Sequence, residues 1–130
     1  MIVVDTNVLV RLLVDDPGSG EQVRTARTRV KHAKQVFVPQ VVQAETVWVL
    51  ESAYGLDKTT IISILEHLAR NQAFVLQHEA SHQKALSAYR KGSADFADYL
   101  IWAQCEAAGH PLLTFDRRLA RTAGVIGLGP

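Results

Sequence analysis

Short runs of apolar, mostly β-branched residues, separated by longer amphipathic stretches, constrain the fold of this chain more than any other feature. The runs at 2–4, 36–38, 74–76 and 111–115 have the length of buried strands. Strands that alternate with helices favour a parallel sheet covered by helices. We therefore predict an α/β fold, a three-layer α/β/α domain whose central parallel sheet has four to five strands, the fifth at 125–128.

The stretches between these runs carry apolar residues three and four positions apart, which is the spacing of one helix face. Asp57 is a good N-cap, and Gly55 and Gly109 are good helix ends. No repeat or linker interrupts the pattern, and 130 residues suit one domain, here 1–130. We expect helices at 7–14, 19–34 (capped by Ser19), 41–54, from 57 past 68, at 80–90, at 93–109 and, briefly, at 116–123.

The composition excludes several classes of protein. With 48% hydrophobic and 21% charged residues, the chain is globular rather than disordered. No run of about 18 apolar residues exists to span a membrane. The first residues lack the basic start and apolar stretch of a signal peptide. The single cysteine, Cys105, cannot form an internal disulfide, so we expect it to fill the core of a cytoplasmic protein.

The net charge of +1 says little, but basic residues gather in two segments. Either segment could contact phosphates. For the first, at 24–34, a solvated helix face is the preferred interpretation. The second comprises Arg117, Arg118 and Arg121 and directly follows Asp116. Its arginines are candidates for RNA phosphate contacts, and a solvated face is an equally good interpretation.

Two aspartates directly follow predicted strands. Asp5 comes after 2–4, and Asp116 comes after 111–115. The carboxyl ends of parallel strands form the edge of the sheet where ligands bind. An aspartate after a strand is also a common helix N-cap, so neither residue is decisive alone.

Glu45 lies within a predicted helix, among Val41, Val42, Trp48 and Val49 at helical spacing. This places it in the stripe expected to face the core. A buried carboxylate needs a strong partner, because leaving its charge unpaired is costly. A buried salt bridge and a bound metal ion are the two possibilities.

Asp98 repeats the pattern, since Ile101 and Trp102 lie three and four residues beyond it, and Asp95 lies one turn earlier on the same face. Carboxylates that converge with no basic residue at matching positions need a cation. A set with only oxygen ligands favours Mg²⁺ or Mn²⁺ over zinc. Such ions promote phosphodiester hydrolysis. Hydroxyl and amide groups able to orient the ligands or a phosphate come from Thr6, Asn7 and Thr114.

Together, the opening Val4-Asp5-Thr6-Asn7-Val8-Leu9, the helical Glu45, the segment Asp95-Phe96-Ala97-Asp98 and the segment Leu113-Thr114-Phe115-Asp116 resemble a PIN domain, and most closely the VapC-type toxins. The resemblance covers essentially the whole chain. It implies a Mg²⁺- or Mn²⁺-dependent endoribonuclease that forms a homodimer and is inhibited by a VapB-type antitoxin. Some PIN domains are nucleases outside toxin pairs.

By position, the resemblance implies that Asp5, Glu45 and Asp116 are the first, second and fourth acidic residues of the site. Asp98 keeps the family's spacing to Gly109 and is preferred as the third, which makes Asp95 an additional metal or proton ligand. The catalytic set is then Asp5, Glu45, Asp98 and Asp116, and the metal ligands are these four with Asp95. Trp102 departs from the family pattern, where a small residue is common.

Three alternatives remain. His78-Glu79-Ala80-Ser81-His82 fits the H-E-x-x-H motif of zinc metalloproteases, although it straddles a predicted strand end and helix start. A non-catalytic module could bind RNA or a protein through the basic segments. A phosphoaspartyl enzyme built on Asp5 is the weakest of the three, because position 7 is asparagine.

Overall fold

The computed structural model describes residues 1–15 and 17–129. The chain divides into two compact units, unit 1 (Met1–Gln77) and unit 2 (His78–Pro130). One domain spanning residues 1–130 stays a prediction. No described helix is long and apolar enough to cross a membrane.

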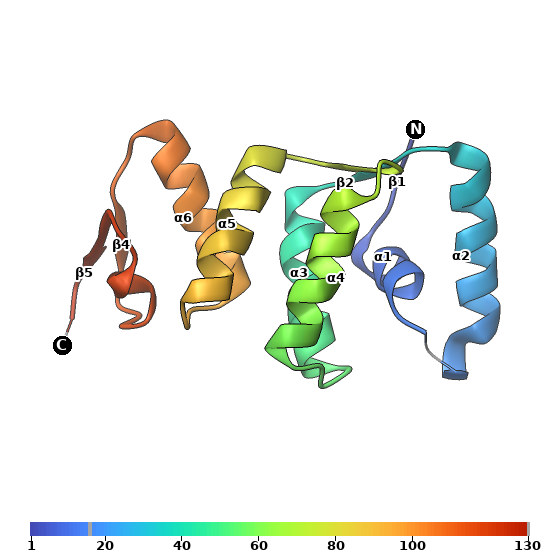
Figure 1. Cartoon of the computed structure of the whole chain (residues 1–130), viewed down its shortest axis with the longest axis horizontal. Coiled ribbons are helices and arrows are strands. Elements are labelled where there is room, and N and C mark those ends of the chain that lie inside the picture. The colour runs from blue at the N-terminus through green and yellow to red at the C-terminus, as the bar shows by residue number, and fades with distance from the viewer. Residues whose placement is uncertain (16, 130) are drawn as a thin grey trace. The chain divides into compact units, whose positions relative to one another are not determined.

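Unit 1 is built on a parallel sheet of three strands, in the order β1 (Ile2–Val3), β2 (Val36–Val38), β3 (Phe74–Leu76). Parallel neighbours need crossover connections, and helices supply them. Between β1 and β2 run α1 (Thr6–Leu13), the 3₁₀ turn η1 (Pro17–Ser19) and α2 (Gly20–Ala33). Between β2 and β3 run α3 (Gln40–Ser52) and α4 (Lys58–Arg70), which contact each other (Figure 1).

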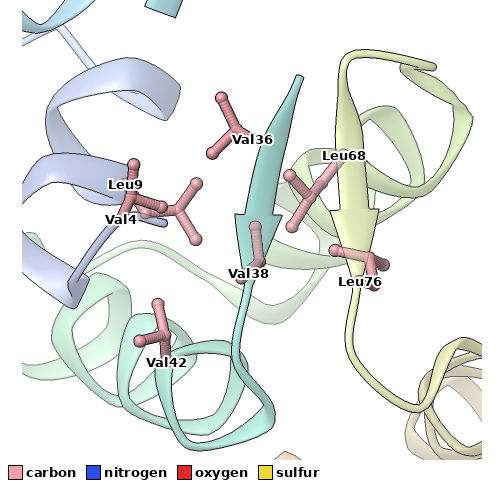
Figure 2. Close-up of a cluster of buried hydrophobic side chains, with 7 residues drawn as sticks. All are labelled: Val4, Leu9, Val36, Val38, Val42, Leu68 and Leu76. Carbon is pink, nitrogen blue, oxygen red and sulfur yellow. The ribbon is translucent and has the colours of Figure 1, made fainter. Parts of the chain in front are cut away.

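The core of unit 1 forms around β2, whose Val36 and Val38 are completely buried. Figure 2 shows these two side chains between Val4 and Leu9 on one side and residues of α4 and β3 on the other. Burying a side chain of this size contributes about 1.5–3 kcal/mol, so the cluster fixes the sheet and its helices as one body. Its members are Val4, Leu9, Val36, Val38, Val42, Leu68 and Leu76.

Of the helix caps predicted in unit 1, the one at Asp57 is confirmed and the other two differ. Asp57 caps α4, and its side chain accepts a hydrogen bond from the Thr60 amide at 2.8 Å. Helix α3 ends at Ser52 with Ala53 as its C-cap, so Gly55 lies in the connection to α4 and does not end the helix as predicted. Its positive φ of 61° suits glycine. Ser19 precedes α2 as predicted, but its side chain makes no capping hydrogen bond. The basic residues of α2 are exposed, and Arg29 lines the same groove as Asp5.

Unit 2 packs α5 (Glu79–Lys91) against α6 (Phe96–Ala108), followed by β4 (Leu112–Thr114), the 3₁₀ turn η2 (Leu119–Arg121) and β5 (Val125–Gly127) (Figure 1). The contact between the helices is aromatic. Tyr89 lies edge-on to Phe96 and to Tyr99, with ring centroids 5.6 and 6.5 Å apart. Strands β4 and β5 pair in parallel.

Three details of unit 2 differ from the prediction. Only the 3₁₀ turn η2 (Leu119–Arg121) forms where a short helix was predicted at 116–123. Helix α6 begins at Phe96 rather than near residue 93, because Asp95 keeps an extended backbone and the Ala94 amide donates to the Tyr99 hydroxyl at 3.2 Å. Cys105 is half-buried rather than part of the core.

Trp102, by contrast, gains a structural explanation. Its indole nitrogen donates to the carbonyl of Ala123 at 3.0 Å and so ties α6 to the turn before β5.

The predicted α/β class with parallel strands is confirmed. The five strands of the described residues form two hydrogen-bonded sheets, with three strands in unit 1 and two in unit 2, instead of the predicted single sheet of four to five strands. The pairings between these strands are all parallel.

Candidate active site

Asp5 stands where β1 gives way to α1 and caps that helix. Its side chain accepts a hydrogen bond from the Val8 amide at 3.0 Å, so the capping interpretation is correct. The carboxylate is exposed. With Asn7 and Arg11 it lines a groove of about 840 Å³ within unit 1, beside α2. Capping therefore positions Asp5 without removing it from solvent.

Glu45 is exposed, so the prediction that it faces the core is wrong. Apolar residues occur on several faces of α3, so their spacing alone did not identify the face that is buried. Val41 and Trp48, its predicted core neighbours, are 65% and 67% exposed. The buried stripe instead comprises Val42, Gln43, Thr46, Val47 and Leu50.

A hydrogen bond from Thr6 holds Glu45 in place. The hydroxyl of Thr6, the residue after Asp5, donates to Oε1 of Glu45 at 3.0 Å. Unit 1 thus brings the Asp5–Thr6 segment at the start of α1 next to the carboxylate of α3. This is the kind of contact expected of a residue that orients a ligand.

In unit 2, Asp98 is half-buried on the first turn of α6. Burial raises the pKa of its carboxyl, and the negative charges of Asp95 and Asp116 raise it further. Asp95 occupies the N-cap position of α6 and is exposed. Unit 2 therefore places two of the predicted carboxylates, Asp95 and Asp116, close enough to Asp98 to oppose its ionisation.

Asp116 follows β4 and is held by the chain around it. Its side chain accepts hydrogen bonds from the amides of Leu119 and Arg118, which lower the pKa of this carboxyl. Its own amide donates to Thr114 Oγ1 at 3.0 Å, so Thr114 acts on the backbone beside the carboxylate.

Arg118, a predicted contact for RNA, is also a partner of Asp116, which sequence reasoning missed. Its Nε lies 3.7 Å from Oδ1 of Asp116, and its charge lowers the pKa of Asp98. The expectation of no basic residue near the carboxylates is therefore wrong. The two-residue spacing between Asp116 and Arg118 could have indicated this contact, since a basic side chain two residues after a capping aspartate can approach its carboxylate. Arg117 and Arg121 are exposed, and Arg121 lines a cavity described below.

The donor chemistry of these residues fits a hard divalent cation. All the candidates are carboxylates, and the pKa of Asp98 is raised first by burial and then by the charges of Asp95 and Asp116, each of which outweighs the lowering by Arg118. Over residues 1–15 and 17–129, no three His, Cys, Asp or Glu side chains form a group that could hold a metal ion. The structure thus provides suitable ligand types without a formed coordination geometry.

The H-E-x-x-H segment is not a zinc site. The motif needs both histidines on one helix face, but His78 precedes α5 with a left-handed φ of 55°. His82 is buried, packs edge-on against Phe96 at 5.5 Å, and burial lowers its pKa to about 4. His82 is a core residue, and the metalloprotease interpretation is wrong.

Comparison with known proteins decides the family. The profile described as the PIN domain matches residues 2–125, which span both units. The chain belongs to the PIN domain family. Membership confirms the predicted three-layer α/β/α class and the recognition of the family from the ordered acidic segments.

A named relative points the same way. The chain is similar to a protein of Aquifex aeolicus (strain VF5) named VapC ribonuclease, with 26% identity over 126 residues, which cover 93% of this chain and 91% of that protein. The two are therefore alike over nearly their whole lengths. Within the PIN domain described here, the candidate carboxylates are Asp5 and Glu45 in unit 1 and Asp95, Asp98 and Asp116 in unit 2.

Proposed function

We propose that this PIN domain is an endoribonuclease that hydrolyses RNA phosphodiester bonds with the help of Mg²⁺ or Mn²⁺. The observation that carries the proposal is the acidic cluster around Asp98, where neighbouring carboxylates oppose ionisation of a half-buried side chain. Such a cluster is stabilised by a cation. The similarity to a protein named VapC ribonuclease supports RNA as the substrate.

In this proposal Asp5, Glu45, Asp98 and Asp116 are the catalytic carboxylates, and Asp95 is an additional metal ligand. A bound Mg²⁺ or Mn²⁺ would act as a Lewis acid that offsets the charge developing on the phosphate. One of the carboxylates accepts the proton of the attacking water.

The surrounding residues keep these carboxylates in place. Thr6 orients Glu45 through its hydroxyl. The Thr114 hydroxyl and the amides after Asp116 fix that residue, and the Arg118 guanidinium helps to keep it ionised. Asn7, exposed beside Asp5, is available to a phosphate. Arg117, Arg118 and Arg121 are the proposed contacts to the RNA backbone.

We further propose that the chain is the toxin of a type II pair. The support is the similarity to a protein named VapC ribonuclease. On this proposal it acts in the cytoplasm as a homodimer, and a VapB-type antitoxin inhibits it. Expression should stop growth, and coexpression of the neighbouring antitoxin gene should restore it. Normal growth with abundant folded protein would favour a PIN nuclease outside toxin pairs.

The nuclease proposal is tested by incubating purified protein with mixed RNA and Mg²⁺, Mn²⁺, Zn²⁺ or EDTA, beside an Asp5→Asn control. We expect cleavage with Mg²⁺ or Mn²⁺ that both EDTA and the substitution remove. Cleavage that survives EDTA would contradict the metal requirement. RNA binding without cleavage under any metal would favour the non-catalytic binding module.

A further inference from the structure

A cavity of about 510 Å³ lies entirely within unit 2, between the end of α5 and the turn η2. This volume falls in the range of about 300–1,000 Å³ typical of small-ligand sites. Three cations and two aliphatic hydroxyls line it, together with the Tyr99 ring and its phenol hydroxyl, and none of its described lining residues is acidic. The cations and aliphatic hydroxyls belong to Lys91, Ser93, Arg118, Arg121 and Thr122.

The positive charge in the cavity is only partly compensated. Arg118 is 3.7 Å from Asp116, but in the described part of the chain neither Lys91 nor Arg121 forms an ion pair. Like charges that face a common space repel one another, and an anion between them relieves the repulsion. The lining therefore favours a negatively charged ligand.

The wall that carries Ser93 is held firmly. A Cβ on Gly92 would collide with the Tyr99 hydroxyl, so only glycine allows the chain to pass this close. The same hydroxyl accepts a hydrogen bond from the Ala94 amide at 3.2 Å. On the opposite wall, the Thr122 amide donates to the Leu119 carbonyl at 3.0 Å. Groups fixed before binding lose little entropy when a ligand arrives.

We propose that this cavity binds a backbone phosphate of the RNA strand, flanking the phosphodiester that is cleaved. The proposal rests on the proposed ribonuclease function and adds Lys91, Ser93 and Thr122 to the RNA contacts. Arg118 connects the cavity with the acidic cluster of unit 2, since it lines the cavity and also contacts the candidate carboxylate Asp116. A strand held here has its neighbouring phosphate close to the acidic cluster of unit 2.

The mixed lining favours a phosphate over the carboxylates of an acidic peptide. A phosphodiester presents several acceptor oxygens, which match guanidinium, ammonium and hydroxyl donors arranged around one space. The contact with Asp116 adds a link to the hydrolytic carboxylates, which a peptide ligand would not need.

The test measures binding of a labelled 12-nucleotide single-stranded RNA by fluorescence anisotropy, in EDTA so that no metal-dependent cleavage occurs. The test variant is Lys91→Gln with Arg121→Gln. Arg118 is left intact because its loss would also disturb Asp116. The control, Arg70→Gln with Arg90→Gln, removes the same charge from exposed positions that do not line the cavity. The rescue variant is Lys91→Arg with Arg121→Lys.

We expect the test variant to weaken RNA binding about tenfold and to lower the slope of the salt dependence by roughly 0.7 for each phosphate that the protein no longer neutralises. The control variant should bind RNA within about twofold of the original affinity, because exposed charges away from a binding site contribute little. The rescue variant, which keeps both positive charges, should recover most of the original affinity. Circular dichroism melts should show that all three variants remain folded.

Other outcomes overturn the proposal. If the test and control variants weakened RNA binding equally, the RNA would be attracted by the general positive charge of the protein and not by a site in this cavity. Failure of the unsubstituted protein to bind RNA would also contradict it, as would a test variant that loses affinity only for inorganic phosphate or for polyglutamate. RNA binding through Lys91 and Arg121 without cleavage under Mg²⁺ or Mn²⁺ would overturn the nuclease function and still support the phosphate site.

Discussion

The two units hold their candidate carboxylates in opposite ways. In unit 1, Asp5 and Glu45 are exposed, and each accepts a hydrogen bond, from the Val8 amide and from the Thr6 hydroxyl. In unit 2, Asp98 is half-buried and its pKa is raised, first by burial and then by Asp95 and Asp116. Unit 1 therefore holds its carboxylates by hydrogen bonds, whereas unit 2 places one carboxyl where burial and neighbouring negative charges oppose its ionisation.

The largest expected effect comes from removing one carboxylate from each unit. Glu45→Gln and Asp98→Asn should each lower RNA cleavage by at least about a hundredfold, as loss of a group that handles a proton does. Their effects on stability should differ. In metal-free buffer Asp98→Asn should raise the melting temperature, because it relieves repulsion, whereas Glu45→Gln should leave it nearly unchanged. Single-turnover cleavage and thermal melts measure both.

Asp95→Asn serves as the comparison for Asp98. Asp95 is exposed at the N-cap position, so its loss should reduce cleavage less than Asp98→Asn does. The reverse order would mean that Asp95 is the third ligand of the family pattern.

Low pH should reduce the stability of the protein through protonation of His82 in unit 2. Burial lowers the pKa of this histidine from 6.5 to about 4, so the unfolded chain takes up a proton that the folded chain excludes. Stability is unaffected above about pH 6.5 and falls as the pH drops toward 4, by about 3 kcal/mol in total. Urea unfolding at pH 7 and pH 4.5 measures this loss. His82→Leu should flatten the pH dependence, while substitution of the exposed His67 of unit 1 should leave it unchanged.

A matched pair of glycine substitutions compares local packing in the two units. Gly92→Ala forces the Tyr99 hydroxyl away from the Ala94 amide and should destabilise the protein by about 1–3 kcal/mol. Gly20→Ala, at the start of α2, meets only Arg24 at 3.8 Å. It should be neutral or stabilise by up to about 1 kcal/mol. Equal denaturation midpoints for the two variants would contradict the close approach at Gly92.

The smallest effect probes how Glu45 is held. Thr6→Val removes the hydroxyl that donates to Glu45 and should lower cleavage about tenfold, as loss of a residue that orients a metal ligand does. Thr6→Ser keeps the hydroxyl and should retain most of the activity. If the valine and serine variants had the same rate, the hydrogen bond would have no role in the reaction.

Most of the fold was predictable because local patterns decided it. The strands at 36–38 and 74–76 match their predicted bounds, and Asp57 caps α4 as expected. The start of α6 was misplaced because Asp95 has an extended backbone and the Ala94 amide before it donates to the Tyr99 side chain instead of to a helical carbonyl. A hydrogen bond between a loop and a later helix residue leaves no periodic signal in the sequence.

The candidate site was predictable in its residue types but not in its burial. Glu45 was placed in the core because Val41 and Trp48 flank it, yet α3 buries Gln43 and Thr46 instead. Gln43 can be buried because its amide donates to the carbonyls of Val38 and Gln77. Such partners come from distant segments, so apolar spacing alone misidentified the buried face.

A double-mutant cycle on Asp5→Asn and Asp98→Asn tests the central proposal, that Asp5 and Asp98 serve one metal-dependent reaction. Residues that act as a unit lose activity non-additively. We predict that the double variant cleaves RNA in Mn²⁺ within about threefold of either single variant, since either loss already disables the site. Losses that multiply, or full activity in either single variant, would contradict the account.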